Sequence, residues 1–169
     1  ARFAGIFLAV LFILLAISAP VGGACTMSVA RSGAASNANG VFVLNDNVYI
    51  ACETGHLIIM PLSSLVAAHD FNIVGSPFDV FVSGSTAYLA DFYNNYGVKV
   101  VNADTGAYLG QCTNWPSGLS AIGIYNSGNY AYVGAAGGNT GGCLVVLSLA
   151  NPSSPSVVNT IESGPMNSG

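Results

Sequence analysis

The chain has very little charge. Only 6% of its 169 residues are Asp, Glu, Lys or Arg, against roughly 25% in an average soluble protein. The 3 basic residues are outnumbered by 7 acidic ones. Because nucleic-acid binding needs clustered Lys and Arg, this composition excludes a phosphate-binding surface. It argues against disorder too, since the chain is 52% hydrophobic with 8 Tyr and 8 Phe.

The motifs of catalytic and metal sites are also missing. The sequence has no C-x-x-C pair and no G-x-S-x-G elbow, and its two histidines, His56 and His69, lack the spacing of a helical metal pair. The glycine-rich residues 137–142 lack the lysine and the helix of a phosphate loop. No two acidic residues can be placed as a glycosidase pair. We therefore expect neither an enzyme nor a cofactor or metal site.

One long apolar run opens the chain. Residues 3–19 carry no charge and follow Arg2. A basic flank, an apolar run and a small-residue end are typical of a signal peptide, here residues 1–24 with cleavage after Ala24. A retained membrane anchor, a helix in a filament core, and lipidation at Cys25 stay open as alternatives. Each alternative takes the rest of the chain out of the cytoplasm, so we expect an exported protein, extracellular or at the cell surface.

After a linker at residues 25–39, the remainder repeats three times. The units are marked by Tyr49, Tyr88 and Tyr132, and each holds four short runs rich in Val, Ile, Tyr and Phe between polar turns. Four strands in a unit of about 40 residues are typical of a β-propeller blade. We therefore predict an all-β fold of three four-stranded antiparallel blades, preceded by an N-terminal hydrophobic helix.

The predicted blades cover about residues 40–75, 79–113 and 121–162. Their strands, in corresponding order, are expected at 41–43, 47–51, 57–60 and 68–74; at 80–82, 86–90, 98–101 and 107–112; and at 122–124, 130–134, 144–147 and 156–161.

The repeats carry the motif of a known family. Residues 128–135, G-N-Y-A-Y-V-G-A, and residues 143–155, C-L-V-V-L-S-L-A-N-P-S-S-P, resemble the LVIVD repeat of bacterial and archaeal surface proteins. The second unit is similar, whereas the first departs from the pattern with Cys52 where the family has an aspartate. The resemblance covers about residues 40–164. It implies a propeller in a cell-surface setting and no particular reaction.

Three blades are too few for a closed propeller, which has roughly four to eight. Residues 165–169 repeat the Pro/Gly/Ser loop that precedes the first strand of the second and third units. We therefore expect a fragment of a longer sequence. The alternative is a short protein whose open arcs complete each other by self-association.

Aromatic loop residues are the candidates for ligand contact. Phe92, Tyr93 and Tyr96 lie in an extended hairpin of the second unit, and Trp115 lies in the loop before the third. Such rings suit an unidentified carbohydrate or protein ligand. The alternative is that they only pack between blades.

The acidic residues of the second unit have structural roles in this prediction. Asp91 ends a strand where the LVIVD family has an aspartate, and we expect it to cap the turn that follows. Asp79 precedes a first strand and could point toward the central channel, but it has no second carboxylate as a partner.

The cysteines are disulfide candidates in an exported protein. They are Cys25, Cys52, Cys112 and Cys143, and the pair Cys112–Cys143 is favoured because both lie in or beside the third blade. Free buried thiols are the alternative.

The function that these observations favour is a non-catalytic β-propeller binding or adhesion module at the cell surface. One alternative is a structural subunit of an extracellular filament, assembled through the apolar helix or open β-edges. A second is a fragment of a propeller-type enzyme, which would need catalytic residues from further sequence.

Overall fold

The computed structural model describes residues 35, 37–93, 97–137 and 142–162. The expected signal peptide or helix at residues 1–24 and the final loop at 165–169 lie outside these ranges. Every regular element in the described residues is a β-strand. None of the described residues belongs to a helix that is long and apolar enough to span a membrane.

Twelve strands form three antiparallel sheets of four. Blade 1 holds β1 (Ala38–Leu44), β2 (Asn47–Cys52), β3 (His56–Pro61) and β4 (His69–Asn72); blade 2 holds β5 (Pro77–Ser83), β6 (Thr86–Asp91), β7 (Val98–Asn102) and β8 (Tyr108–Gln111); blade 3 holds β9 (Leu119–Ser127), β10 (Tyr130–Gly137), β11 (Cys143–Ser148) and β12 (Ser156–Glu162). Within each blade, every strand pairs with the next one in the sequence. The predicted all-β fold of four-stranded blades is confirmed.

Tight turns join the first two strands of each blade. In blade 1, Asn45 and Asp46 have φ of 48° and 61°, the left-handed conformation that Asn and Asp tolerate in a two-residue hairpin. Gly84 and Gly128 take positive φ at the same turn of the other two blades. The polar turn residues therefore fix the register of these hairpins.

The first strand of each blade carries a β-bulge at the same place. The pairing shifts between Ala38 and Gly40 in β1 and between Pro77 and Asp79 in β5. In blade 3 the shift falls where Gly123 and then Ala121 pair with β10. Gly40, Asp79 and Gly123 are thus equivalent positions.

The pairing of β9 with β10 corrects one predicted correspondence. Ile124 takes the position of Val41 and Val80, because Tyr125 pairs with Tyr132 as Phe42 pairs with Tyr49. The predicted alignment of Ile122 with Val41 and Val80 is therefore wrong by two residues.

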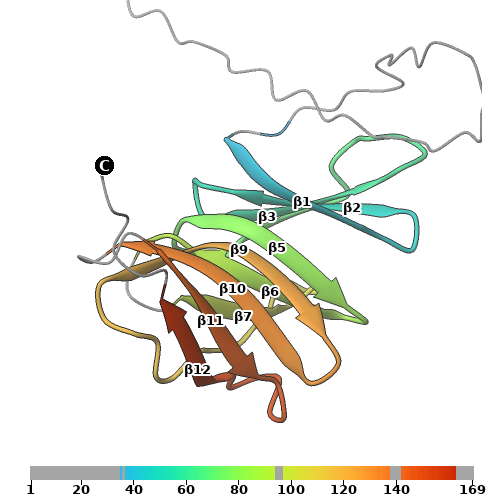
Figure 1. The fold of residues 1–169 in the computed structure, drawn as a ribbon. Helices are drawn as coiled ribbons and strands as arrows, with labels where there is room; N and C mark the ends of the chain where they lie inside the picture. The colour runs from blue at the N-terminus through green and yellow to red at the C-terminus, as the bar shows by residue number, and fades with distance from the viewer. Residues whose placement is uncertain (1–34, 36, 94–96, 138–141, 163–169) are drawn as a thin grey trace, which may run out of the picture.

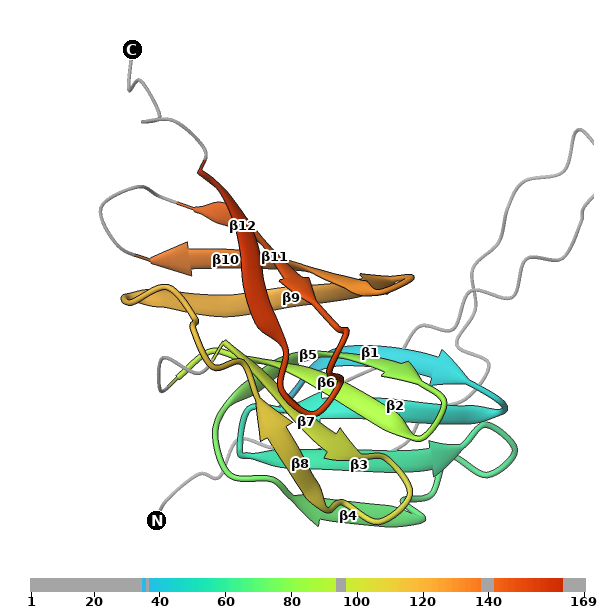
Figure 2. The same ribbon diagram turned by 90° about the horizontal axis from the view of Figure 1, so that it is seen from below.

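The blades pack face to face around their first strands. Blade 2 lies between blade 1 and blade 3 (Figure 1), and β5 contacts both β1 and β9 (Figure 2). Phe42, Phe81 and Tyr125, at equivalent positions of these strands, form a row with ring centroids 4.6 and 5.2 Å apart. This arrangement is propeller-like.

Two apolar layers hold the blades together. Between blades 1 and 2, Tyr49, Leu57 and Ile59 meet Val80, Leu89 and Val101; between blades 2 and 3, Tyr88, Val98 and Val100 meet Ile124, Val133 and Val145. Side chains alternate between the two faces of a strand, so blade 2 turns one apolar face to blade 1 and the other to blade 3. Burying one such Leu or Val side chain stabilises the fold by roughly 1.5–3 kcal/mol.

Candidate functional site: an aromatic loop above a buried ion pair

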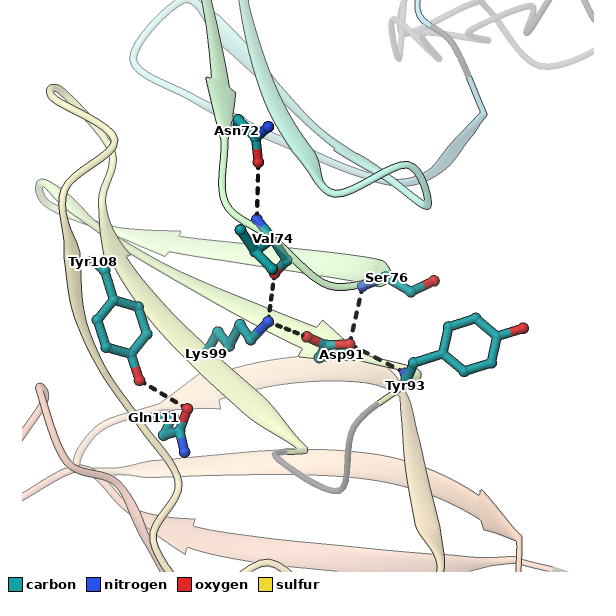
Figure 3. A network of polar contacts seen from close by, with 8 residues as sticks. All are labelled: Asn72, Val74, Ser76, Asp91, Tyr93, Lys99, Tyr108 and Gln111. Atoms are coloured by element: carbon teal, nitrogen blue, oxygen red, sulfur yellow. Dashed lines mark hydrogen bonds and ion pairs between the residues drawn. The ribbon is translucent and has the colours of Figure 1, made fainter.

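The chain's single lysine lies inside the molecule. The side chain of Lys99, in the middle of β7, is 8% exposed, and its Nζ lies 2.7 Å from Oδ2 of Asp91, whose side chain is 1% exposed. Lys99 also donates a hydrogen bond to the carbonyl of Val74, in the linker between blades 1 and 2 (Figure 3). A buried charge is tolerated only when it is paired and hydrogen-bonded. The sequence analysis did not find this pair.

The second carboxylate oxygen of Asp91 positions the backbone around it. Oδ1 accepts hydrogen bonds from the backbone N–H groups of Ser76 and Tyr93, both at 3.1 Å. The N–H of Phe92 donates to the carbonyl of Ser76 at 2.9 Å. One buried carboxylate thus joins the end of β6, the linker from blade 1 and the start of the β6–β7 loop. The prediction that Asp91 caps the following turn is confirmed.

Three rings gather at the start of this loop, and we call them the aromatic platform. Phe92 stacks on Phe78 with ring centroids 4.7 Å apart, and Tyr93 meets Phe92 edge-on at 5.0 Å. Phe78 and Phe92 are half-buried, while Tyr93 is 55% exposed and its ring points away from the ion pair (Figure 3). Of the predicted ligand-contact residues, Phe92 and Tyr93 come together here, and Tyr96 lies outside the described residues.

Trp115 is buried instead of displayed. Its Nε1–H donates to the carbonyl of Leu119 at 2.8 Å, and its ring belongs to the apolar layer between blades 2 and 3. The ring lies so close to Gly97 that a Cβ there would overlap it. The structure therefore gives Trp115 the packing role that the sequence analysis named as the alternative.

A cleft opens beside the ion pair, between the end of blade 1 and the outer strands of blade 2. Its volume is about 330 Å³, within the lower range of small-ligand sites. The lining polar groups are Asn72, Lys99, Tyr108 and Gln111, and the Tyr108 hydroxyl donates to Gln111 Oε1 at 2.8 Å. The cleft combines segments of two blades, so a search along single strands did not predict it. A lone lysine within the apolar run of β7 was the available signal.

Asp79 links blade 2 to blade 3. Its Oδ2 accepts the N–H of Ile124 and its Oδ1 accepts the N–H of Val80, both at 2.9 Å. Burial raises the pKa of this carboxyl, while the two backbone hydrogen bonds act in the opposite direction. These contacts commit the carboxylate to joining the first strands of two blades.

A cysteine, a histidine and an aspartate share one face of blade 1. Nδ1 of His56 lies 2.6 Å from Oδ1 of Asp70, and Cys52 stands opposite His56 in the β2–β3 pairing. Cys52 is fully buried, and its pKa is raised to about 11, first by burial and then by the charge of Asp70. Since the thiolate is the nucleophile, this thiol is not activated for catalysis.

The three described cysteines, Cys52, Cys112 and Cys143, are free thiols, so the favoured Cys112–Cys143 disulfide is not formed. Cys112 lies beside the backbone of Val157 in β12, whereas Cys143 pairs opposite Glu162. Val157 and Glu162 are five residues apart along β12, which is roughly 16 Å. The two cysteines beside them are therefore far beyond the reach of a disulfide. Cys25 lies outside the described residues.

The geometry defines a class of protein: three four-stranded blades packed around their first strands form a partial β-propeller. The LVIVD repeat matches residues 119–162, which are blade 3. The resemblance read from the sequence is thereby confirmed. No curated protein matches the sequence.

Solved structures with a similar fold belong to unlike proteins. Hydrazine synthase of Kuenenia stuttgartiensis matches with a TM-score of 0.62 and 13% identity, over 74% of this chain and 37% of that one. BamB of Moraxella catarrhalis matches with a TM-score of 0.53 and 16% identity, over 73% of this chain and 36% of that one. A quinohemoprotein alcohol dehydrogenase of Pseudomonas putida matches with a TM-score of 0.58 and 8% identity, over 78% of this chain and 22% of that one. The chain spans less than two fifths of each, and identities this low show the fold alone.

Proposed function

We propose that this chain is an exported, non-catalytic β-propeller module that binds a carbohydrate or protein ligand at the cell surface through the aromatic platform. The observation that supports the proposal most directly is that the Tyr93 ring is exposed to solvent and yet held in place. Its ring is 55% exposed, yet its backbone is fixed by the buried carboxylate of Asp91 and its ring rests on Phe92.

A fixed, exposed ring is well suited to recognition. Binding normally costs about 0.5–1.5 kcal/mol for each flexible side chain that must be ordered. Here the hydrogen bond to Asp91 and the contact with Phe92 hold Tyr93 before any ligand arrives. Tyrosine adds an apolar ring and a hydroxyl, and tyrosines are enriched among residues that dominate binding energy. Loss of such a ring typically costs about 2 kcal/mol, or roughly 30-fold in affinity.

The enzymatic alternative has less support from this part of the chain. Propeller structures of similar fold include dehydrogenases, so a fragment of a propeller-type enzyme stays a second candidate. Within the residues that the structure describes, however, no three His, Cys, Asp or Glu side chains gather as ligands for a metal ion. The Cys52 thiol, the nucleophile nearest to a histidine–aspartate pair, is kept neutral.

Binding is tested with the whole chain on an array of surface polysaccharides and glycans and on a panel of purified extracellular proteins. We expect a defined ligand whose affinity falls about 30-fold in Tyr93→Ala and is largely kept in Tyr93→Phe. Tyr130→Ala is the matched control, because Tyr130 is a similarly exposed tyrosine on β10 of blade 3, outside the platform and the cleft. Equal affinity of wild type and Tyr93→Ala would exclude the platform.

Export is tested separately by sequencing the N-terminus of the mature protein. Cleavage of the signal peptide leaves Cys25 as the first residue. Recovery of the intact N-terminus in a membrane fraction shows the anchor, and recovery from the cytoplasm contradicts export.

A further inference from the structure

The two junctions between blades are built alike but are not filled alike. At the junction of blades 1 and 2 lies a cleft of about 270 Å³, which we call the Asp104 cleft. Its polar lining consists of Asn47 at the start of β2, Tyr49, His69 in β4 and Asp104 in the β7–β8 turn. None of these residues lines the cleft beside Lys99.

The junction of blades 2 and 3 shows how the same place can be closed. Ala103 and Leu149 occupy equivalent positions there. The backbone N–H of each donates at 2.8 Å to the carbonyl of the residue before the second strand of its blade, which is Ser85 or Asn129. The Leu149 side chain is 9% exposed and belongs to the apolar layer between blades 2 and 3. The alanine at this position of blade 2 leaves the corresponding volume open.

The fourth strands differ in the same sense. His69 and Gly110 are equivalent, since each stands opposite the third-strand residue that pairs with the tyrosine marking its unit. At Gly110, the carbonyl oxygen of Ser153 in the β11–β12 loop takes the space of a Cβ. The β7–β8 loop, residues 103–107, is shorter than the β11–β12 loop, residues 149–155, and His69 is exposed. The Asp104 cleft is therefore a specific difference between two junctions of one design.

The groups in the Asp104 cleft face one another. Tyr49 is 6% exposed. Burial, and after it the negative charge of Asp104, raises the pKa of the Tyr49 hydroxyl, while a hydrogen bond with the Asn47 side chain acts in the opposite direction. The backbone N–H of Asp104 donates to Asn102 Oδ1 at 2.9 Å. In the part of the chain that the structure describes, the Asp104 carboxylate itself has no hydrogen-bond or ion-pair partner.

This lining is suited to a neutral ligand that is rich in hydroxyl groups. A carboxylate only accepts hydrogen bonds, whereas the side chains of Asn47, Tyr49 and His69 can each donate and accept. A sugar hydroxyl also does both, so neighbouring hydroxyls can donate to Asp104 and accept from the other groups. An anionic ligand is disfavoured, because no described lysine or arginine lines the cleft and Asp104 is negatively charged. Buried Ile59 adds an apolar contact for the C–H groups of a sugar ring.

We propose that the Asp104 cleft is a second binding site, which holds one neutral sugar unit through hydrogen bonds to Asp104, Tyr49 and His69. The size agrees, because a cavity of roughly 150 Å³ holds a benzene ring and a sugar ring carries hydroxyl groups in addition. The site is independent of the aromatic platform. Asp104 follows the end of β7, which pairs with the start of β6, whereas the platform lies beyond the end of β6.

The test titrates the whole chain with the methyl glycosides of glucose, galactose and mannose and follows the backbone amide signals by NMR. A detergent without a sugar headgroup shields residues 3–19. We expect at least one glycoside to give saturable shifts at Asn47 and Asp104. The diamine putrescine is titrated in parallel as a probe for a carboxylate that binds cations.

Two variants copy the second junction into the first. Asp104→Ala introduces the residue type of the equivalent Ala150 and is expected to weaken binding about tenfold or more, since a hydrogen bond to a charged group is lost. Ala103→Leu introduces the side chain of Leu149, fills the cleft and is expected to abolish binding. Glu162→Gln removes an exposed carboxylate from β12 and is the control with unchanged affinity. Circular dichroism confirms folding, and the exposed turn position of Asp104 carries the test if Ala103→Leu does not fold.

The remaining outcomes are decisive as well. Tyr93→Ala is expected to bind the glycoside as wild type does, whatever the platform binds; a loss in this variant would assign the sugar to the platform and overturn the proposal. The absence of saturable shifts with every glycoside overturns it, and so does unchanged affinity in Asp104→Ala. Binding of putrescine without binding of any glycoside shows that Asp104 takes a cation instead.

Discussion

The buried pair of Asp91 and Lys99 gives a prediction whose magnitude follows from its contacts. In Lys99→Met, the Asp91 carboxylate keeps two N–H donors but loses its counter-charge. In Asp91→Asn, the Lys99 ammonium stays buried beside an uncharged amide. Removing one partner of a buried pair costs about 3–5 kcal/mol, since the other charge is left uncompensated.

The double variant Asp91→Asn/Lys99→Met is expected to be more stable than either single variant. Ser76 and Tyr93 both donate to the same oxygen, Oδ1, so the asparagine carbonyl can accept both bonds while the charge is removed. The remaining loss is the hydrogen bond from Lys99 to Val74, worth roughly 1 kcal/mol, and some packing. We therefore expect a loss of about 1–2 kcal/mol for the double variant, against about 3 kcal/mol or more for each single one.

The free energy of unfolding is measured by urea denaturation at neutral pH, following the fluorescence of Trp115, the chain's 1 tryptophan. Repeating the series at high salt provides a control, because screening weakens exposed ion pairs and leaves buried ones nearly unchanged. Single variants that lose less than about 1 kcal/mol, the level of an exposed pair, would refute the reasoning. So would a double variant whose loss equals the sum of the two single losses.

Three further predictions concern other sites. Gly97→Ala should destabilise the protein by about 2–4 kcal/mol and shift the fluorescence of Trp115 to the red, because Gly97 has φ of 61° and a Cβ would overlap that ring. Burial raises the pKa of Asp79 above 3.8, so the folded state binds this proton more tightly than the unfolded state. The stability of wild type relative to Asp79→Asn should therefore fall as the pH rises from 3.8 through the folded pKa, in urea titrations at a series of pH values. A thiol reagent, read out by peptide mapping, should label the half-buried Cys143 faster than Cys52, whose pKa is about 11; equal rates would contradict the burial of Cys52.

The strands were predictable because local chemistry and tertiary position agree in this chain. Val, Ile and Tyr runs between polar turns mark the first three strands of each blade, whereas the fourth is weaker and reads HDFN in β4. The turn residues Asn45 and Asp46 take the conformation that they favour. The correspondence of Ile122 was wrong because β9 continues through the polar residues Asn126 and Ser127, which resemble turn residues. The turn itself comes later, at Gly128. An apolar pattern does not reveal this error of two residues, because Ile122 and Ile124 both fit it.

The site was less predictable because its contacts cross between segments. Phe92 and Tyr93 stand out as loop aromatics, but their support comes from Ser76 and from Lys99, which belong to other strands and linkers. In the sequence, Trp115 and Tyr93 are both aromatic residues in loops, but in the structure Trp115 is buried and Tyr93 is exposed. The contacts that bury the Trp115 ring, with Gly97 and with the carbonyl of Leu119, appear only in the folded structure.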